Sequence, residues 1–309
     1  MAGQVWNTSA LGGYMYSDEL STVMRVVSQP VQRFRNLCDA EDGSQKGLHA
    51  GDTFSWNAYE NIGSQGGRLS ETQAIPESNF RIRQRTMTIY EFGNSIPYTG
   101  LLDDLSKQPL TDVITRLLRD DVAKAYDNEA YAAMSATVVK VRSSSASAIV
   151  VNTAGTLSTG THKMTKAHVQ LISDQMKEAN VPAYDGANYM VVSRPSNLRT
   201  FKNELEQINQ YTESGFGEIE RGEIGRYESC RFVEQTHQAS KGYSSMGDEA
   251  FFLGADTVTE ALVIPEEIRG KIPGDYGRSR GVAWYGLGGF GLVHPDSLDP
   301  RVWHWASDS

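Results

Sequence analysis

Two extended segments separated by a turn-rich stretch constrain the fold of this chain more than any other feature. Residues 52–59 and 80–92 have the pattern of β-strands, and the stretch 61–77 between them contains several Gly and Ser residues. This arrangement predicts a long β-hairpin with a flexible tip. A strand of about 12 residues spans roughly 40 Å at about 3.3 Å per residue, which is too long for one small domain to cover. We therefore expect something outside the monomer to cover part of the hairpin.

Side-chain alternation suggests that the two sides of this hairpin differ. The first strand collects three apolar residues on one face, Phe54, Trp56 and Ala58. The second strand alternates its apolar residues with a ladder of three arginines, Arg81, Arg83 and Arg85. We expect one side of the hairpin to be apolar and the other to be strongly basic.

The ladder of Arg81, Arg83 and Arg85 admits three interpretations. Nucleic-acid contact is disfavoured, because no aromatic side chain is expected on the arginine face to stack on bases. A simple solvated strand face remains open. Contact with carboxylates of an adjoining subunit fits best, since the chain is acidic, with a net charge of −9. The ladder is therefore our candidate subunit interface, together with Phe54 and Trp56.

A long amphipathic helix is predicted after the hairpin. From Leu110 onward, apolar residues recur every three or four positions, which indicates a helix up to about Ser135 with Pro109 near its first turn. Such a helix is about 39 Å long at about 1.5 Å per residue. The polar stretch 143–147 predicts a linker that ends this block.

The rest of the chain predicts a mixed α+β domain and a terminal arm. Helical pattern at 166–179 and 196–208 flanks an apolar strand at 189–192. Further strands are predicted at 231–234, 250–253, 261–264 and 282–285. Residues 1–50 have little periodicity apart from a short helical pattern near 18–27. We interpret this segment as an arm that lies across a neighbouring molecule.

The glycine-rich segment Gly286–Gly291 matches the dinucleotide-binding pattern G-x-G-x-x-G letter for letter. A phosphate-binding glycine loop must open a helix, but Leu292, Val293, His294 and Pro295 follow here. We therefore expect a glycine-rich turn between strands and no nucleotide cofactor.

No other motif points to an active site or a metal centre. The histidines form no metal-binding helical pair, and no G-x-S-x-G elbow supplies a nucleophile. The carboxylates of the 218–228 segment alternate with arginines, which is more typical of a salt-bridged surface than of an acid–base pair or a divalent-metal site; they are Glu218, Glu220, Glu223 and Glu228. The two cysteines lie far apart, which favours a reducing compartment. We expect no enzymatic activity, no cofactor and no metal.

Several short motifs occur in a characteristic order: Gly93–Thr99, then Ile219–Gly225 leading to Arg231–Glu234, then Ile268–Arg278 followed by Gly281–Gly286, with a weaker one at Leu20–Arg25. In this order they resemble the capsid proteins of tailed phages, above all the group typified by phage N-four. The first motif resembles the exit from the extended loop, the second a turn and strand of the axial domain, and the third the return strand into the peripheral domain. The resemblance covers most of residues 14–292. Glu228 and Ser229 depart from it, because many relatives have a glycine in this turn.

This resemblance implies an α+β chain with the HK97-like capsid fold. Its expected parts are an N-terminal arm (1–50), an extended β-hairpin loop or E-loop (51–100), a peripheral domain with a long spine helix (101–160), an axial domain (161–278) and a return to the peripheral domain (279–309).

The resemblance also implies a function. The expected protein is a structural major capsid protein that self-assembles as hexamers and pentamers into the icosahedral head around a double-stranded DNA genome. Scaffolding and portal proteins are the implied partners, the packaged DNA is contacted weakly and non-specifically, and no membrane is involved. The chain would reside in the virion after assembly in the host cytoplasm. A bacterial nanocompartment shell protein of the encapsulin type is the alternative, and an uncharacterised soluble enzyme is a more distant one.

Overall fold

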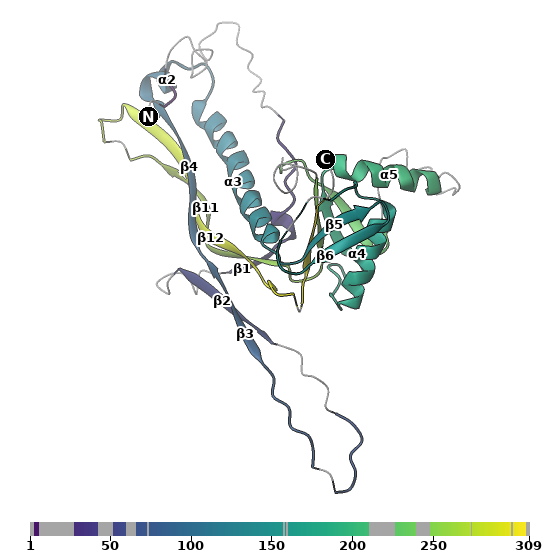
Figure 1. Ribbon diagram of the computed structural model, residues 1–309. Coiled ribbons are helices and arrows are strands. Elements are labelled where there is room, and N and C mark those ends of the chain that lie inside the picture. Colours follow the sequence, from purple (N-terminus) through teal and green to yellow (C-terminus); the bar gives the residue numbers. More distant parts are fainter. Residues whose placement is uncertain are drawn as a thin grey trace.

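The computed structural model describes residues 3–5, 28–42, 52–59, 66–72, 74–156, 158, 160–209, 226–238, 248–272, 274–297 and 299–306. Most of the predicted arm, the helical pattern near 18–27 and the motif at 219–225 lie outside the described residues. In Figure 1 a body made of two sheets and a long helix carries a hairpin that projects far beyond it.

Among the described residues, a run of strands precedes residue 100, a longer run follows residue 209, and most helices lie between the two runs. The helices are η2 (Arg35–Leu37, a 3-10 helix), α2 (Gly100–Leu105), α3 (Leu110–Ser135), α4 (Lys166–Glu178) and α5 (Pro195–Asn209). The strands are β1 (Asp39–Asp42), β2 (Thr53–Tyr59), β3 (Ile82–Thr88), β4 (Tyr90–Thr99), β5 (Lys140–Ser145), β6 (Ala148–Asn152), β7 (Tyr189–Ser193), β8 (Arg226–Tyr227), β9 (Cys230–Glu234), β10 (Glu249–Leu253), β11 (Val258–Gly270), β12 (Ser279–Leu292) and β13 (Val302–Ala306).

The long helix α3 lies along a four-stranded sheet with the strand order β1-β11-β12-β4 (Figure 1). Its predicted bounds are confirmed, and Pro109 is its N-cap residue. The buried stripe of the helix packs against β4 and β12, where the apolar cluster also includes Tyr98, Val282 and Trp284. Hydrogen bonds also join the helix to the sheet: Asp121 of α3 accepts from Trp284 Nε1 of β12 and Asn94 Nδ2 of β4, both at 2.9 Å.

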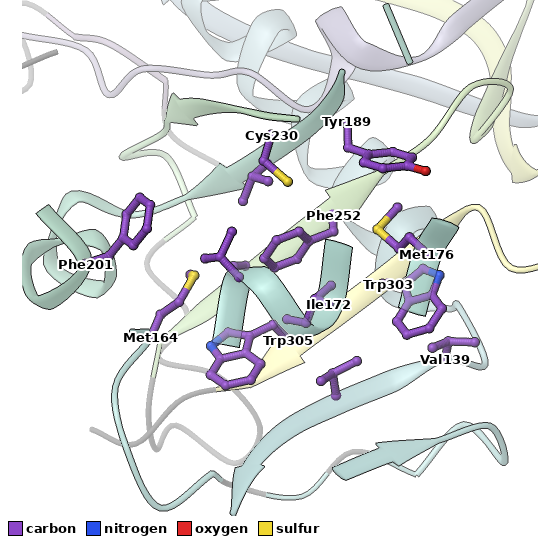
Figure 2. Close-up of a cluster of buried hydrophobic side chains, with 14 of the residues drawn as sticks. Val139, Met164, Ile172, Met176, Tyr189, Phe201, Cys230, Phe252, Trp303 and Trp305 are labelled. Atoms are coloured by element: carbon purple, nitrogen blue, oxygen red, sulfur yellow. The ribbon is translucent and has the colours of Figure 1, made fainter. Parts of the chain in front are cut away.

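A seven-stranded sheet with the order β6-β5-β13-β10-β7-β9-β8 forms the second part of the body. Strand β7 is buried throughout, and its side chains alternate between two cores. Tyr189 and Val191 point to the core shown in Figure 2, which also contains Trp305 and residues of α4. Met190 and Val192 belong to a core on the other side. The continuous apolar run of this strand follows from burial on both faces.

Helix α3 connects the two parts of the body. Its middle, at Tyr126, belongs to the core of the four-stranded sheet. One to two turns later, Ala130 and Met134 are fully buried in the core beneath β7 and β10. A single helix therefore contributes to two cores, and its C-terminal turns sit against the seven-stranded sheet.

The glycine-rich segment 286–291 lies inside β12, so the predicted turn is wrong. A Cβ on Gly286 would lie 2.3 Å from Tyr126 Oη, and one on Gly288 would lie 2.8 Å from the carbonyl oxygen of Ala261. These distances are far shorter than a real Cβ contact. The glycines are therefore needed because α3 and β11 approach the strand closely, which is the other common use of glycine in a strand.

The polar stretch 143–147 is a β-hairpin between β5 and β6, not a linker. Ser143 is fully buried, yet its hydroxyl donates to His162 O at 2.8 Å and accepts from His162 N at 2.9 Å. A buried serine with both partners supplied by backbone is compatible with a strand. Serine-rich composition alone does not distinguish this situation from a loop.

The sheets divide the chain differently from the expected ranges. Strands β5 and β6, expected in the peripheral part, join the seven-stranded sheet, as does β13 from the expected C-terminal return. Strand β11, expected in the axial part, pairs with β12 in the four-stranded sheet. The sheet that each of these strands joins is decided by pairing with segments distant in the sequence, and local sequence patterns do not contain this information.

Glu228 and Ser229, which stand where many capsid-protein relatives have a glycine, form the turn between β8 and β9. Both residues have positive φ, 47° and 60°, and they connect the pair Tyr227↔Cys230. Two-residue hairpins with positive φ at both positions favour Gly and Asn. We expect Ser229→Gly to raise the free energy of unfolding by about 0.5–1 kcal/mol, because relief of left-handed strain exceeds the entropy cost of glycine.

Chemical denaturation checks this expectation: the denaturant concentration at the midpoint of unfolding should rise, while the dependence of the free energy on denaturant stays unchanged. Ser147→Gly is the matched control, since Ser147 lies in the β5–β6 turn and is not among the residues with positive φ. That variant should be slightly less stable than wild type. Equal shifts in the two variants would contradict the strain interpretation.

Candidate functional site

The root of the long hairpin is the paired region of β2 and β3. Its register places Phe54 opposite Met87, Trp56 opposite Arg85 and Ala58 opposite Arg83. Directly opposed residues of an antiparallel pair point to the same side. The prediction of an apolar side and an opposite basic side is therefore wrong. Alternation within each strand is correct, but the relative phase of two strands is set by their register, which the sequence pattern did not contain.

The side that carries Phe54, Trp56, Arg83 and Arg85 faces the body, and we call it the docked face. Phe54 is 2% exposed and Met87 5% exposed, and both pack against Ala261 of β11. Trp56 lies over Gly291, where a Cβ would come within 3.0 Å of the indole. Phe54 is thus covered by its own chain, and the hairpin root is held by a small apolar cluster.

Two rungs of the arginine ladder meet one carboxylate of the same chain. Arg83 Nη1 lies 2.8 Å from Asp296 Oδ2, and Arg85 Nη2 donates to the same oxygen. All three side chains are partly buried, so this shared ion pair is stronger than one on an open surface. Arg81 is exposed and forms no ion pair with any described residue. Contact between the ladder and a neighbouring subunit stays a prediction.

Asp296 belongs to a segment that we call the clasp, made of residues 294–297 and 299–301. It borders an open cleft of about 620 Å³ between the hairpin root and the residues that follow α4. Within the clasp, Asp299 Oδ2 lies 3.2 Å from His294 Nδ1 and 3.0 Å from Arg301 Nη2. Burial, with help from Arg301, lowers the pKa of His294. The clasp then continues into β13, so one short segment joins the hairpin root to the seven-stranded sheet.

The opposite side of the hairpin, which we call the outward face, has no charged side chain along the paired region. It consists of Thr53, Ser55, Asn57, Tyr59, Ile82, Gln84, Thr86 and Thr88. Its far end is apolar and exposed: Tyr59 is 70% exposed, Phe80 59% and Ile82 51%, and the rings of Tyr59 and Phe80 lie 6.3 Å apart. Sequence reasoning missed this surface, because it concentrated on the arginines.

The described part of the predicted arm is anchored on its own chain. The backbone N–H groups of Phe34 and Arg35 donate to Asp127 Oδ1 at 2.8 and 3.2 Å, and His237 Nδ1 lies 2.8 Å from Asp127 Oδ2. Asp127 is 1% exposed, although it lies on the helix α3. Arg35 also pairs with Glu260 at 2.8 Å. A buried carboxylate of α3 therefore fixes the base of the described N-terminal segment.

The described residues offer little that resembles reactive chemistry. Among them, no group of three or more His, Cys, Asp or Glu side chains could hold a metal ion. Burial raises the pKa of the Cys230 thiol to about 12 and raises that of Cys38 as well. Both thiols are accordingly poor nucleophiles at neutral pH. No helix in the described part of the chain is long and apolar enough to cross a membrane.

No protein-family model matches the chain, and no curated protein matches it either. Solved structures do. The capsid structure of the cyanophage P-SCSP1u is similar with a TM-score of 0.69 at 11% identity, covering 96% of this chain and 94% of that chain. The capsid of Ralstonia phage GP4 gives 0.68 at 15% identity, covering 97% of both chains. The acidic stable capsid structure of Helicobacter pylori bacteriophage KHP30 gives 0.67 at 13%, covering 98% of this chain and 99% of that chain.

The chain has the HK97-like capsid fold. The likeness takes in nearly the whole chain, so the HK97-like fold includes the hairpin, the long helix and both sheets together. This confirms the α+β class and the fold expected from the sequence resemblance. At these low identities the likeness concerns the fold and not the individual residues of the hairpin root.

Proposed function

We propose that this chain is the major capsid protein of a tailed phage, a structural shell subunit without enzymatic activity. The observation that carries the proposal is the likeness to phage capsid structures over nearly the full length of both chains. A fold alone does not imply a function. Here, however, the projecting hairpin adds a surface that a monomer leaves uncovered.

The outward face supports assembly on physical grounds. Tyr59, Phe80 and Ile82 are more than half exposed where the pairing of β2 and β3 ends, on a hairpin that projects from the body (Figure 1). Burial of apolar surface contributes about 25 cal/mol per Å². Covering this surface with a neighbouring subunit therefore favours association. The proposed interface consists of the outward face and Arg81, with carboxylates of the neighbour as partners of the arginine.

The parts of the chain receive corresponding assignments. The four-stranded sheet with α3 as the spine helix would be the peripheral domain, the seven-stranded sheet the axial domain, and the hairpin the E-loop. Hexamers and pentamers of such subunits would form the icosahedral head. Scaffolding and portal proteins would be partners, with double-stranded DNA enclosed and contacted weakly, as suits a net charge of −9. The chain would be found in the virion after assembly in the host cytoplasm.

Co-expression with the neighbouring scaffold and portal genes tests the proposal. Electron microscopy and sedimentation should then show closed shells. A chain that stays monomeric under all such conditions would contradict it. Shells that form without a scaffold and enclose an enzyme would instead indicate a nanocompartment.

Ile82→Glu tests the outward face directly. Since Ile82 is 51% exposed, the variant should fold like wild type. Burying an unpaired carboxylate in a subunit contact costs several kcal/mol, and each 1.4 kcal/mol corresponds to a factor of about ten, so the yield of shells should fall at least about tenfold. Quantitative sedimentation measures this yield. Ile82→Val, which keeps the site apolar, is the matched control and should assemble normally. Normal shells from the glutamate variant would show that the outward face is solvated in the shell.

A further inference from the structure

A chain of polar side chains crosses the interior where α3 meets the seven-stranded sheet. Lys140 Nζ donates to Ser135 O at 2.6 Å and lies 3.0 Å from His304 Nδ1. His304 Nε2 in turn lies 3.4 Å from Glu249 Oε1, whose other oxygen accepts a hydrogen bond from Tyr131 Oη at 2.5 Å. This network of polar side chains thus starts and ends on α3 and passes through β5, β13 and β10.

These groups are almost completely enclosed. Lys140 is 7% exposed, His304 3% and Glu249 9%. On β13, His304 lies in register between Lys140 of β5 and Phe251 of β10, whose ring stacks on the imidazole with centroids 4.4 Å apart. Ionisable side chains in such positions are costly to bury. Well-packed apolar residues would often be at least as stabilising, so the polar chain calls for a role beyond stability.

The hydrogen-bond pattern specifies one protonation state. A charged Lys140 ammonium is only a donor, so Nδ1 of His304 must accept and Nε2 must carry the hydrogen. Nε2 faces the Glu249 carboxylate at 3.4 Å, a contact that is long for a hydrogen bond, so this buried atom is held by charge attraction without a short hydrogen bond. The network therefore consists of a cation, a neutral imidazole and an anion. A second proton on the imidazole would have to sit on Nδ1, directly facing the ammonium 3.0 Å away.

We propose that Lys140, His304, Glu249 and Tyr131 form a proton-sensitive lock that holds the C-terminal turns of α3 on the seven-stranded sheet. At neutral pH the lock is closed. Protonation of His304 places two cations side by side in a buried site and separates Lys140 from the histidine. The contact between the helix end and the sheet then opens locally.

The electrostatics of the site agree with this geometry. Burial lowers the pKa of His304, Lys140 lowers it further, and Glu249 opposes both. Burial also lowers the pKa of Lys140 to about 8, so the ammonium is largely protonated at pH 7 and fully so in acid. Among the described residues, the charged groups that face His304 are thus Lys140 from β5 and Glu249 from β10, with the Tyr131 hydroxyl of α3 behind the latter.

The direction of the pH effect follows from linkage. Because the folded pKa of His304 is below its usual value of about 6.5, the open state takes up the proton first as the pH falls. The stability of the closed contact is therefore full above pH 6.5 and is lost as the pH falls below it. For one proton, the opening equilibrium constant should rise by up to about tenfold per pH unit.

Amide hydrogen exchange on the unassembled full-length chain, corrected for the intrinsic pH dependence, measures this opening. In wild type, the corrected exchange rates of the amides of residues 131–142 and 302–306 should increase as the pH falls from 7 to 5. In His304→Gln, which keeps a neutral polar group, the increase should disappear. Lys140→Met should reduce the increase, because the repulsion is removed while burial remains. His162→Gln is the matched control, since His162 is exposed on the surface, and it should behave like wild type.

A measurement on wild type alone keeps the proposal testable if the variants do not fold. The ring of His304, followed by NMR, should remain neutral in the folded chain at pH 5.5. Titration of this ring near pH 6.5 without any local opening would overturn the proposal. So would an unchanged pH dependence of exchange in folded His304→Gln.

Discussion

Gly289→Val is expected to detach the root of the hairpin from the body and to lower the free energy of unfolding by about 3 kcal/mol or more. Gly289 lies in β12 opposite Ala261, and a Cβ there would lie 2.6 Å from the carbonyl oxygen of Thr88 and 3.5 Å from Ile89 Cα. Both atoms are backbone, so no side-chain rotation relieves the collision. Valine adds two further methyl groups at the same place.

The position of Thr88 makes the consequence specific. Strand β3 ends at Thr88 and β4 begins at Tyr90, so the collision occurs at the junction between the hairpin and the four-stranded sheet. The hairpin must move away from β12, which separates Phe54 and Met87 from Ala261. Limited proteolysis should therefore cut near residues 52 and 89 much faster than in wild type, and shells should not form.

Gly270→Val is the matched control for this variant. Gly270 ends β11 in the same sheet, and nothing lies within 4 Å of a Cβ built on it. It should retain the stability and assembly of wild type. Equal losses in the two variants would mean that the effect comes from the backbone freedom of glycine and not from the close approach of the hairpin.

The elements that were predicted well are those with strong local periodicity. The helix α3 begins and ends at the predicted residues, and α4 and β7 differ from the prediction by one residue at most. In each case an apolar pattern repeats over several turns or runs through a short buried strand, so the chain itself carries the information.

The wrong predictions share a non-local cause. The glycines of β12 and the serines of β5 have turn-like composition, but close neighbours from distant segments make them strand residues. The phase between β2 and β3 depends on their register, which a period-2 pattern does not contain. Similarly, the alternation of the arginines identified Arg83 and Arg85, yet their partner Asp296 lies more than 200 positions away in the chain.

Reversing the charges at Arg83 and Arg85 is expected to release the hairpin while the body stays folded. In the double variant with glutamate at both positions, two carboxylates would face Asp296 where two cations stood. An exposed ion pair contributes only about 0–1 kcal/mol, but three converging carboxylates in a partly buried site repel one another. Circular dichroism should show a folded protein, and sedimentation should show no shells, because the outward face is no longer presented at a fixed angle.

Adding Asp296→Arg to this double variant tests whether Asp296 is the partner of the two side chains. If the clasp is the partner, restoring opposite charges should recover docking and a large part of the shell yield. Arg81→Glu on its own separates the two roles of the ladder, since Arg81 forms no ion pair with the described part of its own chain. Loss of shells in that variant, without rescue by Asp296→Arg, is expected if Arg81 binds carboxylates of a neighbouring subunit. Normal assembly of both charge-reversed proteins would instead mean that neither the ion pairs with Asp296 nor Arg81 is needed for assembly, and that the apolar cluster around Phe54 alone holds the hairpin.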